Sequence, residues 1–261
     1  MSYEFLNLTY EGNIAVVEID IPPANTLSSG SIKELRAAVK DLENNDNVHG
    51  VVVTGAGRFF VAGADIKEFV PALGDYDKGL SMAEAGQALC DEIEAMKKPV
   101  VAAINGAALG GGLELAMGCH YRIAASDAIL GLPELKLGLI PAFGGTQRLS
   151  RLTDMGTAID IILTGKQLKG DEAKELGIVH QSVALDDLRD VALATAKALV
   201  DGKSMTSVSR ALEAITGGYN DSIEKGLELE RKLFAELFLT DDAKEGVTAF
   251  VDKRKPDFKH S

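Results

Sequence analysis

The sequence predicts an α/β protein that ends in a purely helical region. Strand-like alternation and helix-like periodicity of apolar residues take turns through the first two thirds of the chain, and after about residue 185 only the helical pattern remains. With 261 residues, of which 46% are hydrophobic, the chain is long enough to bury a substantial core. We therefore expect an α/β core over residues 1–200 and a helical region over residues 201–261.

The N-terminal part is predicted to hold a hairpin, a helix and a buried strand. Apolar residues alternate in residues 5–10 and 14–19, and the residues Glu11-Gly12-Asn13 between them are typical of a turn. Ser28 or Ser29 can cap a helix that runs to about residue 44 with apolar residues at helical spacing. The continuously apolar residues 48–54 then predict a buried strand.

The order of helix and then strand returns before the helical region begins. Residues 82–97 predict a helix and residues 100–104 a strand. A short helix then begins at the triple glycine 110–112, carries Glu114 and leads to a strand over residues 121–125. The remaining helices are predicted over residues 188–200, 204–216, 223–237 and 241–251.

Apolar residues on the last two helices predict contact with another subunit. At helical spacing they form faces that are too apolar to stay in water. These residues are Leu227, Leu233, Phe234, Leu237, Phe238, Val247 and Phe250. We therefore expect an obligate oligomer.

Charge and composition argue against several classes of partner. A formal net charge of -12 disfavours a nucleic-acid interface, which needs clustered Lys and Arg. There is no run of 18 apolar residues, so we expect no membrane span. Two cysteines, Cys90 and Cys119, and no apolar leader indicate the reducing cytoplasm. The four histidines show no metal-ligand spacing, so no metal is expected.

Two glutamates beside glycine-rich backbone are the strongest candidates for catalysis. Glu114 lies in an otherwise apolar helix, where a carboxylate is costly to bury unless it is hydrogen-bonded or functional. The glycines before it leave amide groups open to a ligand and favour developing negative charge. Glu134 follows Gly131-Leu132-Pro133, where a solvated turn residue is also a reasonable interpretation. Together the two glutamates suggest an acid/base pair beside an oxyanion site.

A second glycine-rich segment, residues 54–67, follows an expected strand and ends at a helix start with Asp65 in its first turn. Its glycines suit a loop that wraps a ligand, and an ordinary strand-to-helix connection is an equally good interpretation. The triple glycine could likewise serve only tight helix packing. A dinucleotide-binding fingerprint is disfavoured because its glycine spacing fails after Gly57, and motifs of serine hydrolases, zinc proteases and P-loops are absent.

Taken in order, these segments resemble the crotonase superfamily, and most closely the enoyl-CoA hydratases. The resemblance covers essentially the whole chain. It includes both glycine-rich segments, both glutamates, the run Ile140-Pro141-Ala142-Phe143-Gly144-Gly145-Thr146-Gln147-Arg148-Leu149 and the C-terminal residues 245–255. It implies a spiral core of repeated ββα units, which is the catalytic part, and a C-terminal helical region that builds trimers, usually paired into hexamers.

The resemblance also implies roles for individual residues. The amides of Ala64 and Gly111 would form the oxyanion hole for the thioester carbonyl of a 2-enoyl-CoA. Glu114 and Glu134 would add water across its 2,3 double bond to give a 3-hydroxyacyl-CoA. CoA would be contacted by Arg58, Ala62 and Lys67 and, from a neighbouring subunit, by Phe250 and Lys253. The CoA belongs to the substrate, and no separate cofactor is expected.

Hydration chemistry suits these residues. Water addition builds enolate character on the thioester oxygen, where one preorganised N–H donor is worth roughly 3 kcal/mol. The reaction also needs a carboxylate to take a proton from water and a neutral carboxyl to protonate the α-carbon. Two acids packed close together favour this combination, because the charge of one raises the pKa of the other. We assign water activation to Glu114 and α-protonation to Glu134, although the two couple through one water.

Ala142 and Phe143 depart from the hydratase pattern, which commonly has glycine and a small residue at these positions. The Phe143 ring either narrows the acyl pocket or faces the core. Enoyl-CoA isomerisation, acyl-CoA hydrolysis and decarboxylation remain alternative reactions, although relatives that catalyse them usually replace one glutamate. A non-catalytic RNA-binding relative is less favoured because of the acidic charge. Acyl-chain length and pathway do not follow from the sequence.

Overall fold

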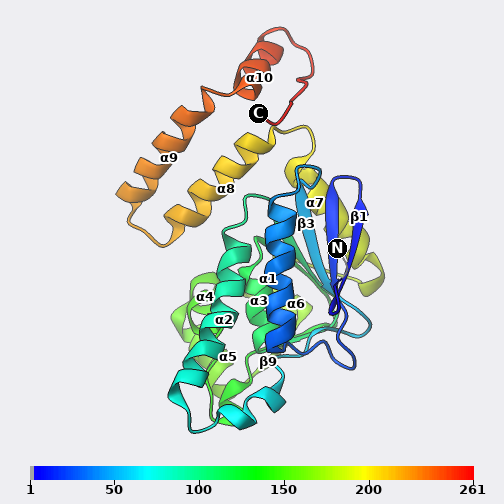
Figure 1. Ribbon diagram of the computed structural model, residues 1–261, viewed down its shortest axis with the longest axis vertical. Coiled ribbons are helices and arrows are strands. Elements are labelled where there is room, and N and C mark those ends of the chain that lie inside the picture. Colours follow the sequence, from blue (N-terminus) through cyan, green and yellow to red (C-terminus); the bar gives the residue numbers. More distant parts are fainter. Residues whose placement is uncertain (1–2) are drawn as a thin grey trace.

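The computed structural model describes residues 3–261 and contains two β-sheets with helices packed around them (Figure 1). The larger sheet has the strand order β1-β2-β3-β5-β7-β10, and the smaller sheet has the order β4-β6-β8-β9. In the larger sheet only the β1–β2 hairpin is antiparallel. The larger sheet consists of β1 (Leu6–Glu11), β2 (Ile14–Ile19), β3 (Gly50–Gly55), β5 (Val100–Ile104), β7 (Tyr121–Ala125) and β10 (Gln181–Val183).

One unit repeats along the core: a strand of the larger sheet, a short strand of the smaller sheet and a helix. The repeats are β3-β4-α2, β5-β6-α3 and β7-β8-α4. The short strands are β4 (Phe59–Val61), β6 (Ala107–Leu109), β8 (Ile129–Gly131) and β9 (Gln167–Lys169). The expectation of an α/β core of repeated ββα units is confirmed.

The helices agree closely with the predicted ones at the two ends of the chain. The α-helices are α1 (Ser29–Glu43), α2 (Tyr76–Glu94), α3 (Gly111–Gly118), α4 (Gly145–Leu152), α5 (Met155–Thr164), α6 (Gly170–Glu175), α7 (Leu185–Val200), α8 (Met205–Tyr219), α9 (Ile223–Leu237) and α10 (Asp241–Val251). Short 3-10 helices are η1 (Ile66–Glu68), η2 (Val70–Ala72) and η3 (Glu134–Leu137).

The predicted start of α2 is wrong by six residues. The helix begins at Tyr76 because the side chain of Asp75 accepts a hydrogen bond of 3.1 Å from the amide of Lys78 and so caps it. The first turns, including Tyr76 and Leu80, are exposed and therefore lack the apolar spacing that revealed the rest of the helix. Asp65 is also placed differently from the prediction, because it caps the short η1 helix and does not lie in its first turn.

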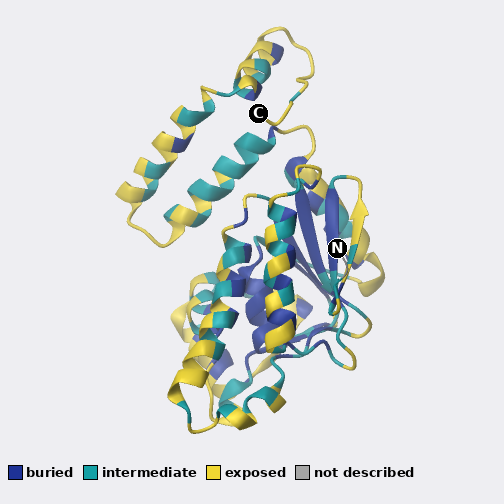
Figure 2. Ribbon diagram, in the orientation of Figure 1, coloured by how far each residue is buried: buried dark blue, intermediate teal, exposed yellow. Residues whose placement is uncertain are grey.

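The middle of the core is apolar on every side. All five residues of β5 and all eight residues of α3 are buried, and α7 packs against β3, β5 and β7 (Figure 2). Because α3 has no exposed face, its only charged residue, Glu114, is fixed inside the protein. No helix in residues 3–261 has the length and apolar character needed to cross a membrane.

Helices α8, α9 and α10 project from the rest of the molecule as an arm (Figure 1). Its surface is largely exposed in the single chain, with Phe238 73% exposed and Phe250 85% exposed (Figure 2). Leu233 corrects the expected exposed face, because it is only 3% exposed and packs within the chain itself. The other apolar residues named for this face are exposed or half-buried.

Candidate active site

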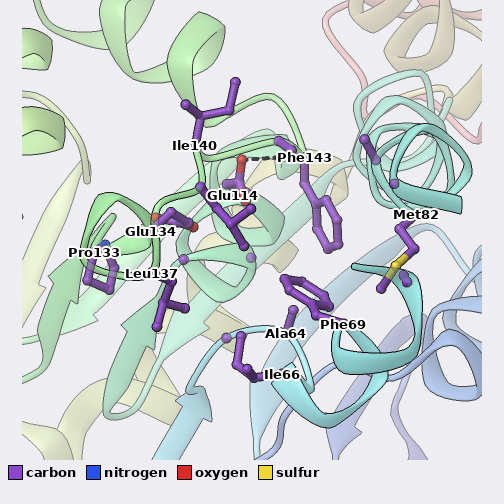
Figure 3. A pocket seen from close by; sticks show the side chains of 18 of the residues that line it. Ala64, Ile66, Phe69, Met82, Glu114, Pro133, Glu134, Leu137, Ile140 and Phe143 are labelled. Atoms are coloured by element: carbon purple, nitrogen blue, oxygen red, sulfur yellow. Dashed lines mark hydrogen bonds between the residues drawn. The ribbon is translucent and has the colours of Figure 1, made fainter. Parts of the chain in front are cut away.

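A cavity of about 590 Å³ lies where the start of α3, the η1–η2 segment, the start of η3 and residues 139–143 meet (Figure 3). Its walls are mainly apolar, with side chains such as Ile66, Phe69 and Met82 opposite Leu137 and Ile140. Two carboxyl groups, those of Glu114 and Glu134, interrupt this lining. An apolar cavity with a few converging polar groups is typical of a small-molecule site.

Glu114 is held in place by two backbone amides. Its side chain is 2% exposed, and its Oε1 accepts hydrogen bonds from Phe143 N at 2.8 Å and from Gly145 N at 2.7 Å. Gly145 can approach this closely because it has no side chain: a Cβ built there would lie 2.8 Å from Glu114 Oε1. One oxygen of the carboxyl is therefore occupied by the protein, which leaves Oε2 to interact with a ligand in the cavity.

Glu134 is the first residue of η3 and approaches the start of α3 from the other side. Gly110, which precedes α3, has a φ of 52°, and a Cβ built on it would lie 2.7 Å from Glu134 Oε1. Glycine is required here both for this backbone conformation and for the space that Glu134 occupies. Glu134 Oε2 is buried and receives no hydrogen bond from any residue in the described range 3–261. A buried oxygen without a partner is rare in native proteins and points to function.

Burial raises the pKa of both acids, and the charge of Glu134 raises that of Glu114 further. Burial, and next the negative charge of Glu134, raise the pKa of Glu114 from 4.5 to about 8, against the opposing effect of the two amides. Burial also raises the pKa of Glu134. Near neutral pH the site can therefore hold both a neutral carboxyl and a carboxylate, which is the combination that general acid/base chemistry requires.

The amides of Ala64 and Gly111 lie side by side at the same cavity. A Cβ built on Gly111 would be 3.8 Å from Ala64 N, and both residues line the cavity. Within residues 3–261 neither amide donates a hydrogen bond to the protein. Gly111 is the first residue of α3, so its N–H lies at the positive end of the helix dipole. Two free donors this close together can both donate to one anionic oxygen.

The chain matches the family model described as enoyl-CoA hydratase/isomerase over residues 9–261. It belongs to this family. It is 48% identical over 257 residues to the probable enoyl-CoA hydratase of Bacillus subtilis (strain 168), covering 97% of this chain and 98% of that protein. It is 42% identical over 250 residues to the short-chain-enoyl-CoA hydratase of Clostridium acetobutylicum, covering 95% of each. The crystal structure of an enoyl-CoA hydratase from Bacillus anthracis has a TM-score of 0.91 and 35% identity, covering 99% of this chain and 100% of that one.

The positions that the family resemblance assigned to CoA fall into two groups. Ala62 lines the cavity. Arg58, which precedes Ala62 in the sequence, and Lys67, which follows it, are exposed. Phe250 and Lys253 do not line the cavity of their own chain: they lie on and just after α10, at the far end of the molecule from η1 and the start of α2 (Figure 1). Within one chain these two residues therefore lie away from the cavity.

The amides of Phe143 and Gly145 are the part of the site that sequence reasoning missed. The pair Gly144-Gly145 in the family run was the available signal, since adjacent glycines indicate close backbone approach. The same run contains Phe143, for which two orientations had remained open. Its ring is 9% exposed, so it belongs to the core, and it also forms part of the cavity wall (Figure 3).

Proposed function

We propose that this protein is an enoyl-CoA hydratase, which adds water across the 2,3 double bond of a 2-enoyl-CoA to give a 3-hydroxyacyl-CoA. Relatives over nearly the whole chain carry this activity in their names. The single observation that carries the proposal within this family is that two carboxyls, Glu114 and Glu134, share one cavity with two free amides. The family resemblance implies that relatives with other reactions usually replace one of these glutamates.

In the proposed mechanism the thioester oxygen accepts hydrogen bonds from the amides of Ala64 and Gly111. Water held between the two carboxyls attacks C3, and its proton passes to Glu114. The electron pair of the double bond moves toward the thioester oxygen, where the two donors stabilise the enolate. C2 then takes a proton from Glu134. Transfer of the proton from Glu114 back to Glu134 completes the cycle, and no redox step or additional cofactor is involved.

The environment of Glu114 suits the task of activating water. The mechanism starts from the protonation state in which Glu114 is the carboxylate and Glu134 carries the proton. Because the pKa of Glu114 is about 8, its carboxylate is a stronger base than that of an ordinary glutamate, and a base performs best when its pKa is near the working pH. The two amides on Oε1 fix the direction of the carboxyl, so Oε2 is the oxygen that meets water. Glu134, the second carboxyl that lines the cavity, is proposed to carry the proton for C2.

The activity test uses the loss of the conjugated thioester absorbance of crotonyl-CoA. We expect the wild-type protein to remove this absorbance and to form 3-hydroxybutyryl-CoA, and we expect the double variant Glu114→Gln/Glu134→Gln to be inactive. Glu84→Gln is the matched control, because Glu84 is exposed on α2 and outside the cavity. Full activity of the folded double variant, or a product formed by isomerisation, hydrolysis or decarboxylation, would overturn the proposal.

We also propose that the protein works as a homotrimer or a pair of trimers. The apolar surface of α9 and α10 supports this, since Phe234, Phe238, Val247 and Phe250 are all more than half exposed in one chain. In such an assembly Phe250 and Lys253 would reach the CoA bound to a neighbouring subunit. The formal net charge of -12 disfavours a nucleic-acid partner.

A further inference from the structure

The ring of Phe143 forms part of the cavity wall. It lies beside Met82 of α2 (Figure 3), and a Cβ built on Gly111, the first residue of α3, would lie 3.2 Å from it. Its backbone is fixed, because Phe143 N donates to Glu114 Oε1 at 2.8 Å and Phe143 O accepts from Arg148 Nη1 at 3.2 Å. The position of the ring is therefore coupled to the position of the Glu114 carboxyl.

Two glycines on two different helices make room for this ring. Gly86 lies on α2, and a Cβ built there would coincide with the ring carbons of Phe143, so the ring packs directly on the helix backbone. Gly111 lies on the opposite side, where a built Cβ would be 3.2 Å from Cδ2 and Cε2 of Phe143. The ring can move neither back into α2 nor sideways into α3, and the remaining direction leads into the cavity.

Gly79, Met82 and Ala83 of α2 also line the cavity, and Gly86 follows them on the same face of the helix. The cavity would continue along this face as far as Gly86 if the ring were absent. A phenylalanine at 143 thus fills the volume that a glycine at 86 leaves open. The ring therefore closes the volume next to Gly86 off from the apolar cavity.

We propose that Phe143, with Gly86 behind it, is the residue that restricts this site to short 2-enoyl chains. This inference rests on the proposed hydratase function. With the thioester oxygen at the amides of Ala64 and Gly111 and the reacting carbons at Glu114, the next carbons of the chain meet the Phe143 ring. Each methylene that cannot be accommodated changes kcat/KM by about tenfold or more.

The experiment compares kcat/KM for trans-2-hexenoyl-CoA and trans-2-octenoyl-CoA with kcat/KM for crotonyl-CoA. We expect the wild-type protein to prefer crotonyl-CoA, and we expect Phe143→Ala to raise the ratio of long-chain to short-chain kcat/KM by about tenfold or more. Phe143→Leu should raise it less. Gly86→Ala should lower the ratio, because the new methyl group pushes the ring into the cavity, while Gly30→Ala on α1 should leave it unchanged, since a Cβ there meets only ordinary contacts.

The double variant Phe143→Ala/Gly86→Ala provides the sharpest test, because the methyl group at 86 has no ring to displace in it. We expect the effects of the two substitutions on the ratio to be non-additive. Circular dichroism and thermal melting identify variants that do not fold. If the alanine variants of Phe143 do not fold, the ratios of Phe143→Leu and Gly86→Ala test the inference. A ratio of long-chain to short-chain kcat/KM within twofold of the wild-type ratio in folded Phe143 variants would overturn this inference and leave the proposed function intact. A wild-type protein that hydrates no enoyl-CoA would instead overturn the proposed function.

Discussion

The amide of Phe143 donates a hydrogen bond to Oε1 of Glu114 over 2.8 Å, so the residue whose ring lines the cavity also positions a buried carboxyl. Arg148 extends this link, because it donates to Phe143 O and pairs with Glu94 and Asp91 of α2 at 2.8 and 2.6 Å. The loop before α4 is therefore anchored both to α2 and to Glu114. Backbone placement in this loop decides where the proposed base points.

The first prediction concerns Gly145, whose amide is the second donor to Glu114. In Gly145→Ala the new Cβ would lie 2.8 Å from Glu114 Oε1 and 2.7 Å from Pro141 Cβ, so the carboxyl must shift. We expect kcat for crotonyl-CoA to fall about tenfold to a thousandfold, the range attributed to a misplaced general base. Steady-state kinetics provide the measurement. Gly30→Ala should keep wild-type kcat, and equal rates for the two variants would contradict the role of the amide clamp.

The second prediction separates backbone strain from contact with Glu134. Gly110 and Gly12 both have positive φ, 52° and 69°, so alanine strains the backbone at either position. Only at Gly110 would the new Cβ meet Glu134 Oε1, whereas at Gly12 it meets nothing within 4 Å. We expect Gly12→Ala to lower the melting temperature with normal kcat, and Gly110→Ala to lower both. Normal kcat in a folded Gly110→Ala variant would argue against a catalytic position for Glu134.

The third prediction is a pH dependence of stability that comes from Glu114. Its pKa is raised in the folded protein from 4.5 to about 8, so the folded state binds the proton more tightly than the unfolded state. This contribution is complete below pH 4.5 and is lost as the pH rises toward 8. Glu114→Gln cannot ionise and keeps an oxygen that accepts from the two amides. The melting temperature of Glu114→Gln minus that of the wild type should therefore increase as the pH rises from 4.5 to 8.

Each unit of pKa shift corresponds to about 1.4 kcal/mol, so the gain should amount to several degrees. Thermal melts from pH 4.5 to pH 9 measure the difference, with Glu84→Gln as the control on an exposed face of α2. We expect the difference curve for Glu84→Gln to be flat. A flat curve for Glu114→Gln as well would mean that Glu114 is not held neutral by burial.

The fourth prediction concerns assembly through the helical arm. Sedimentation or light scattering should give a mass of three or six times the 27.6 kDa of one chain. Phe238→Asp places a charge on a surface that is 73% exposed in the single chain and that we expect to be covered in the oligomer, so smaller species should appear. Tyr10→Asp, on the exposed side of β1, is the matched control and should leave the mass unchanged. A wild-type monomer at micromolar concentration would contradict this assembly.

Elements with a strong local signal were predictable from the sequence. Ser28 caps α1 as expected, with its hydroxyl accepting from Ser31 N at 3.1 Å, and α9 and α10 have the predicted bounds. The strands of the smaller sheet were missed because each has three residues, too few to show alternation. Their pairing depends on contacts between distant segments of the chain, which no short window of sequence contains.

The site was predictable in its chemistry and less so in its geometry. A carboxylate in the apolar surroundings of Glu114 indicated function, and the cavity brings Glu114, Glu134, Ala64 and Gly111 together. The place of Phe143 could not be read from the sequence because it depends on the empty volume at Gly86, 57 residues earlier in the chain. Such complementarity between a ring and a missing side chain is a property of packing.

The two proposed oxyanion donors are main-chain groups, and this limits how the protein can change over time. A substitution that replaces the side chain leaves the peptide N–H in place, so single substitutions rarely remove the hydrogen bonds to the thioester oxygen. The carboxyls, in contrast, can each be lost or exchanged by one codon change. Divergence on this scaffold should therefore retain activated thioesters as substrates while the fate of the enolate varies.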